Sequence, residues 1–181
     1  TSNCDKESGV LCLVWIGSSS TRKYLEQILP HLEQASHKVE HLKLKVIADF
    51  ELQSRYLNIQ TIHWREDSEA LELCKSHIGI APMPEDNWTK GKCALKVLQY
   101  MAAGLPVISS KSGVNADVID HKISGLLISD NSEWHSIIEM LAKDIDGLRY
   151  MGELGQKKVR TEYDIEVVFN KLLDHIKTLT K

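Results

Sequence analysis

Apolar residues are arranged along this chain in two patterns, as short continuous runs and as residues spaced three or four positions apart. Six short runs rich in Val, Ile and Leu are bounded by Gly, Pro or polar residues, a pattern typical of buried strands. These runs are 10–16, 42–48, 59–64, 78–82, 105–109 and 125–128. Between them, apolar residues recur three or four positions apart, as on one face of a helix. This spacing predicts helices over 18–34 (with a kink at Pro30), 68–76 and 91–103, a short one near Asn115, and three pieces after Ser132 broken near Gly147 and Tyr163.

Strands that alternate with helices predict parallel strands joined by right-handed crossovers. The expected fold class is therefore α/β, a doubly wound, Rossmann-like parallel sheet of about six strands. Residues 10–181 would form one domain that ends in helices, and the polar residues 1–9 would be a linker. The chain begins without a methionine, which suggests a fragment of a longer protein. Because ligands bind outside the carboxyl ends of such strands, the loops 17–23, 64–67, 84–96 and 110–117 should line one crevice.

Composition limits the classes of partner. The chain has 181 residues, of which 43% are hydrophobic, and a formal net charge of -3, so it lacks the basic surface of a nucleic-acid-binding domain. No run approaches the ~20 apolar residues of a membrane span. The four cysteines have no CxxC spacing, which predicts reduced, mostly buried thiols and a cytoplasmic location. The eight histidines show no metal-ligand spacing, so no metal site is predicted.

The first loop, GSSSTRK, has the features of an anion site at a helix N-terminus. Backbone N–H groups there are unpaired and lie at the positive end of the helix dipole. The candidate phosphate ligands are the loop's glycine, its hydroxyl residues and its lysine, namely Gly17, Ser18, Ser19, Ser20, Thr21 and Lys23. Ordinary N-capping by serine explains the same residues equally well. The GxGxxG fingerprint is absent, which disfavours NAD or FAD.

The pair Gly91-Lys92 invites comparison with the phosphate loop of nucleotide hydrolases, GxxxxGK[ST]. The comparison fails because Asp86 stands at the position of the first glycine and Cys93 at that of the hydroxyl residue. What remains is the N-terminus of a predicted helix that carries Lys92, with Lys96 one turn later on the same face. A solvated lysine face is the alternative interpretation.

Two further loops complete the expected crevice. In SKSGVNAD, the residues Gly113, Val114 and Asn115 precede or open a predicted helix, where backbone amides can meet a phosphate. Three helix N-termini directed at one crevice favour a diphosphate as the ligand. Trp64 and Arg65 follow the third strand and could stack on and hydrogen-bond a nucleobase, although a tryptophan at this place is as often a packing residue.

The segment GKCALKVLQYMAAGLPVISSKSGVNADVI resembles the donor-binding signature of the glycosyl transferases group 1, the family-4-like glycosyltransferases. The resemblance is strongest over Met-Ala-x-Gly-x-Pro-Val at 101–107 and extends over nearly the whole chain. It implies the C-terminal half of a GT-B fold, which binds a nucleotide sugar (a UDP-, GDP- or ADP-sugar). The missing N-terminal half would bind a glycan or lipid-linked acceptor, and any membrane association would belong to it. The resemblance further implies a retaining, metal-independent hexosyl transfer without a cofactor, and a fragment that is inactive alone.

The family's two glutamates, eight residues apart, fall on Gly91 and Gln99 of this chain. The amide oxygen of Gln99 can still accept a hydrogen bond from a ribose hydroxyl, whereas Gly91 has no side chain to hold the donor sugar. Either Glu85 or Asp86 then reaches in from the loop to replace the missing glutamate, or the sugar is held differently, or activity is lost. Lys23 and Lys92 would stabilise the negative charge that grows on the departing diphosphate. We therefore expect Lys23, Lys92 and Glu85 to be the catalytic residues.

Two alternatives stay open. The loss of the first glutamate also fits a degenerate, non-catalytic nucleotide-binding half. A nucleotide-sugar epimerase of the same architecture would need proton-transferring groups in the crevice, and Glu85, Asp86 and His63 are the candidates.

Overall fold

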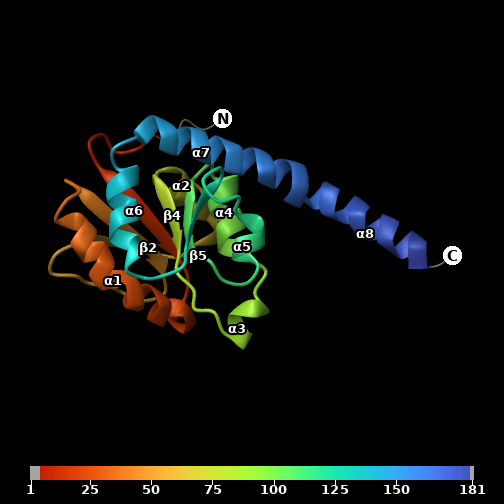
Figure 1. The fold of residues 1–181 in the computed structure, drawn as a ribbon, viewed down its shortest axis with the longest axis horizontal. Coiled ribbons are helices and arrows are strands. Elements are labelled where there is room, and N and C mark those ends of the chain that lie inside the picture. The colour runs from red at the N-terminus through yellow and green to blue at the C-terminus, as the bar shows by residue number, and fades with distance from the viewer. Residues whose placement is uncertain (1–4, 180–181) are drawn as a thin grey trace.

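The computed structural model describes residues 5–179 and has a parallel sheet with helices on both faces (Figure 1). The strands are β1 (Leu11–Ile16), β2 (Leu42–Ala48), β3 (Asn58–His63), β4 (Ile78–Ala81), β5 (Val107–Ser110) and β6 (Gly125–Ile128). They lie in the order β3-β2-β1-β4-β5-β6, and all neighbouring pairs are parallel. This order confirms the doubly wound, Rossmann-like sheet, and its winding reverses between β1 and β4.

Helices cover both faces because the central strands β1 and β4 are buried on both. The helices are α1 (Arg22–Ser36), which follows the 3-10 turn η1 (Ser19–Thr21), α2 (Glu66–Cys74), α3 (Asn87–Lys90), α4 (Leu95–Ala102), α5 (Asn115–Val118), α6 (Glu133–Leu141), α7 (Ile145–Lys158), the π-helical turn η2 (Val159–Tyr163) and α8 (Ile165–Leu179). Leu25 of α1 and Trp134 of α6 pack with Leu13 on one face of the sheet. Val97 of α4 packs with Val14 on the other face. All six residues of β1 are buried, as expected for a central strand.

The side chain of Tyr100 lies between β1 and β4 where the winding reverses. The two strands pair directly only at Leu13↔Ile78 and Val14↔Gly79. Beyond this point, the Ile16 N–H donates to the Tyr100 hydroxyl oxygen (2.8 Å), and that hydroxyl donates to the Ile80 carbonyl oxygen (3.3 Å). A Cβ at Gly79 would lie 2.4 Å from Cγ of Tyr100, so this position has room for the ring only as glycine. The hydroxyl of α4 therefore takes the place of a direct bond between the strands.

The helix predicted over 91–103 is wrong at its start. The structure has the short α3, then an irregular segment over 91–94, and α4 begins only at Leu95. Asp86 caps α3, since its carboxylate accepts from the Thr89 N–H (2.7 Å) and its own N–H donates to the Thr89 hydroxyl oxygen (3.0 Å). Ala94 then adopts a left-handed conformation with φ 56°, which separates the two helices. Gly91 and Lys92 consequently do not open a helix, and Lys92 is not on one helical face with Lys96.

The C-terminal helices also differ in part from the prediction. The first break falls at residues 142–144 rather than near Gly147, because Asp144 caps α7 by accepting from the Gly147 N–H (2.8 Å). The second break, after Tyr163, is confirmed. Helix α8 projects away from the sheet (Figure 1) and buries none of its described residues, unlike α6. Within residues 5–179, no helix is both long enough and apolar enough to cross a lipid bilayer.

The expectation of reduced, mostly buried thiols holds for one of the described cysteines. Cys12 is free and buried in β1. Cys93 is free but exposed, because it lies in the irregular segment before α4 and not on a packed helix. Cys74, at the end of α2, is disulfide-bonded, so the prediction of a reduced thiol is wrong there. Cys4 lies outside the described residues.

We expect the substitution Tyr100→Phe to lower the free energy of unfolding by about 1–3 kcal/mol, because it leaves the buried Ile16 N–H and Ile80 carbonyl without their shared partner. Urea unfolding followed by circular dichroism measures the loss. Tyr150→Phe is the matched control, since Tyr150 is 63% exposed. Equal stability of Tyr100→Phe and the wild type would contradict the bridging role of the hydroxyl.

Candidate functional site

The structure has a cavity of about 100 Å³ at the carboxyl ends of β1 and β4. It lies at the reversal of winding, where ligands of doubly wound sheets bind. Of the predicted residues, Thr21, Lys92, Lys96 and Asn115 line it, so three of the four predicted loops meet there. Its volume is below the roughly 300–1,000 Å³ of pockets that enclose drug-sized ligands. The cavity can therefore hold only part of a nucleotide.

Lys96 is the central cation of this cavity. Its ammonium group donates to the Thr21 hydroxyl oxygen (3.2 Å) and lies 4.5 Å from the centroid of the Trp15 ring. A Cβ at Gly17 would lie 2.8 Å from Nζ of Lys96, so the absence of a side chain there leaves room for the ammonium group. Burial, and then the nearby charge of Lys92, lower the pKa of Lys96 to about 8. No carboxylate of residues 5–179 forms an ion pair with it, which leaves a half-buried cation suited to an anionic ligand.

The serine loop has fewer available phosphate ligands than its sequence predicts. The Ser19 N–H and hydroxyl donate to the two carboxylate oxygens of Asp49, at 2.8 and 3.2 Å. The Ser18 N–H donates to the Thr21 hydroxyl oxygen (3.4 Å). Lys23 is exposed and does not line the cavity. Thr21 is thus the member of this loop that the structure brings to the cavity.

Of the three residues predicted to be catalytic, only Lys92 reaches the cavity. Its Nζ lies 4.9 Å from the centroid of the Trp88 ring. Glu85 is exposed and lines a separate hollow of about 340 Å³ together with 110–112 and 128–131. Gly91 ends α3, and a Cβ there would meet only the Trp88 carbonyl oxygen, at 3.6 Å. Space for a side chain at Gly91 is therefore open, although this chain does not use it.

A carboxylate that sequence reasoning missed, Glu69 of α2, connects two predicted residues. Nε1 of Trp64 donates to Oε2 of Glu69 (2.6 Å), and Nε2 of Gln99 donates to Oε1. The guanidinium of Arg65 is engaged elsewhere, in hydrogen bonds to both carboxylate oxygens of Asp67 (3.0 and 2.6 Å). Glu69 is one of three acidic residues in the first turn of α2. Its place just after the third strand is the only feature of the sequence that could have indicated a role in the site.

The fourth predicted loop supplies a packed amide and a glycine with a special backbone conformation. Gly113 has φ 49°, in the left-handed region that favours glycine. Asn115 is buried, and its Nδ2 donates to the Ser109 hydroxyl oxygen (2.9 Å). Val114 precedes α5 and is half-buried. Asn115 therefore ties the cavity wall to β5.

The family model of the glycosyl transferases group 1 matches residues 11–144. The chain belongs to this family. A comparison with curated protein sequences gives no significant match.

Solved structures share the fold of this group 1 chain at low sequence identity. The C-terminal domain of LpcC, a glycosyl transferase group 1 family protein from Francisella tularensis, has a TM-score of 0.64 and 19% identity, with 86% of this chain and 87% of that one covered. A glycosyltransferase from Rickettsia africae has a TM-score of 0.74 and 16% identity, over 97% of this chain and 49% of that one. Anabaena HepE, in complex with UDP and glucose, has a TM-score of 0.74 and 11% identity, over 94% and 49%. The chain thus spans about half the length of the last two proteins.

Gly91 and Gln99, which occupy the positions of the two family glutamates, lie on different elements of this chain. Gly91 is at the end of α3, whereas Gln99 is inside α4, and the irregular segment separates them. Gln99 is half-buried and bonded to Glu69 through its amide nitrogen. Its amide oxygen is therefore left as the acceptor, as the resemblance requires.

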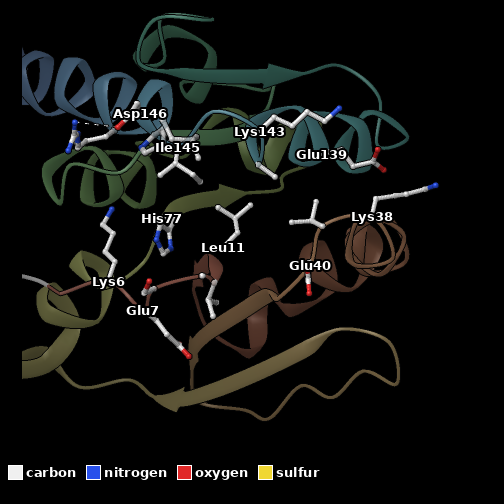
Figure 2. A pocket seen from close by; sticks show the side chains of 18 of the residues that line it. Lys6, Glu7, Leu11, Lys38, Glu40, His77, Glu139, Lys143, Ile145 and Asp146 are labelled. Carbon is white, nitrogen blue, oxygen red and sulfur yellow. Dashed lines mark ion pairs between the residues drawn. The ribbon is translucent and has the colours of Figure 1, made fainter.

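A larger cavity, of about 890 Å³, opens at the amino ends of the strands of this group 1 chain (Figure 2). Its charged side chains carry both signs, namely Lys6, Lys38, Lys143 and Arg149 against Glu7, Glu40, Glu139 and Asp146. Arg149 pairs with Asp146 (3.4 Å), and Glu7 pairs with Lys43 (3.2 Å). Because its charges are balanced and it faces away from the reversal of winding, we place the candidate site at the carboxyl ends.

His77 of this larger cavity generates a prediction about pH. Its Nδ1 accepts from the Cys12 N–H (3.1 Å), and burial, reinforced by Lys6 and Lys45, lowers its pKa from 6.5 to about 4. Between these pH values the unfolded state binds a proton that the folded state does not, so stability falls as the pH decreases through this range. We expect His77→Asn, which can keep an acceptor for Cys12, to flatten this part of the profile of unfolding free energy against pH.

Urea unfolding at a series of pH values measures the two profiles. The control is His175→Asn on α8, an exposed position, which should follow the wild type. Parallel profiles for His77→Asn and the wild type would contradict a neutral, half-buried His77.

Proposed function

We propose that this chain is the donor-binding half of a glycosyltransferase that moves a hexosyl group from a nucleoside-diphosphate sugar to a glycan or lipid-linked acceptor. The observation that carries the proposal is the half-buried ammonium group of Lys96, at the reversal of winding and without a carboxylate partner among the described residues. Removing a cation from water without a counter-charge is unfavourable. A bound diphosphate would supply that counter-charge.

The second charge in the cavity gives this diphosphate a catalytic consequence. Lys92 lines the same cavity as Lys96 and is close enough to lower its pKa, so the two cations repel one another. When the bond between sugar and diphosphate breaks, negative charge grows on the departing β-phosphate. Two fixed cations at that place stabilise this charge more than the ground state, which is the requirement for catalysis. In this proposal Lys23, in the first turn of α1, and Glu85, in the loop between β4 and α3, lie outside the cavity and act only if these segments move toward it.

The remainder of the donor would extend from the cavity toward β3. Trp64 is 46% exposed at the end of that strand and offers a face on which a base can stack. HepE has been solved with UDP-glucose and Staphylococcus aureus TarM with UDP, so a UDP-sugar is the first candidate, ahead of GDP- and ADP-sugars. We propose further that the transfer is retaining, uses no metal or cofactor, and takes place in the cytoplasm with an acceptor held by a second domain.

Calorimetric titration with UDP, GDP and ADP, each with and without magnesium, tests the proposal. We expect one diphosphate to bind selectively with an affinity that does not depend on magnesium. Lys96→Met should weaken this binding about tenfold or more, since it removes the charge-assisted bond but keeps the apolar stem over Trp15.

Lys143→Met is the matched control, because Lys143 lines the opposite cavity and should not affect the affinity. Failure of all three nucleotides to bind the wild type would overturn the proposal. Binding without any transfer of sugar by the protein that contains both halves would favour the degenerate, non-catalytic alternative.

The lowered pKa of Lys96 predicts that binding takes up protons. At pH 8 about half of the Lys96 side chains are in the charged ammonium form, and an adjacent diphosphate raises their pKa. Binding should therefore take up as much as about half a proton at pH 8, and affinity should decrease as the pH rises above 8. Calorimetry in buffers of different ionisation enthalpy measures the uptake. Equal binding enthalpies in all buffers at pH 8 would show that the diphosphate does not contact Lys96.

A further inference from the structure

The carboxylate of Glu69 is held in place by two neutral donors from different elements. The indole N–H of Trp64 binds one oxygen (2.6 Å) and the amide of Gln99 binds the other. Each carboxylate oxygen has two lone-pair positions, so each keeps one for a further donor. Among the side chains that the structure describes, no lysine, arginine or histidine forms an ion pair with Glu69. The result is an oriented, charged acceptor with unused capacity.

This acceptor lies next to the cavity described above. Gln99 follows Lys96 by three residues in α4, so the two side chains lie on one face of the helix, with about 5–6 Å between their Cβ atoms. Lys96 is at the end of the helix that lines the cavity, and Glu69 is bonded to the residue one turn further along. In a nucleoside diphosphate, the ribose ring separates the α-phosphate from the 2′- and 3′-hydroxyls. Phosphate and hydroxyls therefore follow one another in the same order as Lys96 and Glu69.

Carboxylates commonly recognise ribose in doubly wound folds, since a vicinal diol offers two O–H donors to two carboxylate oxygens. Glutamine offers a single neutral acceptor oxygen in place of two charged ones, so it binds a diol more weakly. We propose that Glu69, held by Trp64 and Gln99, is the acceptor for the ribose 2′- and 3′-hydroxyls of the nucleotide. This inference rests on the proposed function and assigns the ribose subsite to a residue of α2.

The alternative role for Glu69 is purely structural, as a connection between α2, α4 and the loop after β3. The two roles differ in what they do to ligand selectivity. A structural connection, when weakened, lowers the affinity for every nucleotide alike. A ribose acceptor affects only ligands that carry the hydroxyls.

The experiment compares UDP, GDP and ADP with their 2′,3′-dideoxy forms by calorimetry. We expect the wild-type chain to bind the preferred ribonucleotide about tenfold or more tightly than its dideoxy form. In Glu69→Gln this ratio should fall about threefold or more, because a neutral amide oxygen is a weaker acceptor than a carboxylate. The double variant Glu69→Gln with Gln99→Glu exchanges the amide and the carboxylate, and it should restore a ratio well above one because the pair keeps one charge. Glu66→Gln, on the exposed side of the same helical turn, is the matched control and should keep the wild-type ratio.

Two results would overturn the inference while the proposed function stands. One is equal affinity of the wild type for ribose and dideoxy ligands, and the other is a ratio that is unchanged in Glu69→Gln even if both affinities fall. Absence of binding by any of the three ribonucleotides would overturn the proposed function, and the inference with it. Circular dichroism spectra and urea midpoints of the variants verify that each one is folded.

Discussion

The bridge that the Tyr100 hydroxyl makes between β1 and β4 is the constraint on which the site depends. It accepts from one strand and donates to the other at the level where direct pairing has stopped. Because Tyr100 belongs to α4, the same bond fixes the position of this helix along the two strands. Lys96 and Gln99 are on the same short helix, so their positions relative to the strand ends follow from it. A buried hydroxyl in the core thereby determines where the half-buried Lys96 ammonium group and Gln99 amide lie at the strand ends.

One glycine and one aromatic ring make room for the Lys96 ammonium group. Gly17 leaves space for the Lys96 ammonium group, and the ring of Trp15 lies beneath it. The ring gives a favourable cation–π contact but cannot neutralise the charge. The pKa of Lys96 is therefore still lowered by burial. Glu69, one helix away, has the complementary property of a carboxylate bonded only to neutral donors. At the carboxyl ends of the strands, the ammonium group of Lys96 and the carboxylate of Glu69 therefore do not form an ion pair with each other.

The strands were predictable because their signal is local, whereas the site depends on contacts that the sequence does not display. The run over 42–48 reproduces β2 at both ends, because alternating apolar residues mark a strand locally. The start of α4 was mispredicted because an alanine, Ala94, adopts the left-handed conformation that a sequence usually marks with glycine. Three of the four loops predicted from the strand ends meet at the cavity, whereas the loop 64–67 does not line it, and the strand ends do not indicate which side chains turn inward. Glu69 looked like any acidic residue in a first helical turn, and only its contact with Gln99, 30 positions away, distinguishes it.

A crystal structure of this chain with the nucleoside diphosphate that binds best would test the central claim most directly. The account predicts the diphosphate in the cavity at the ends of β1 and β4, with its oxygens on Nζ of Lys96 and close to Thr21 and Lys92. A diphosphate bound instead in the cavity at the amino ends, among Lys6 and Lys143, would contradict the account.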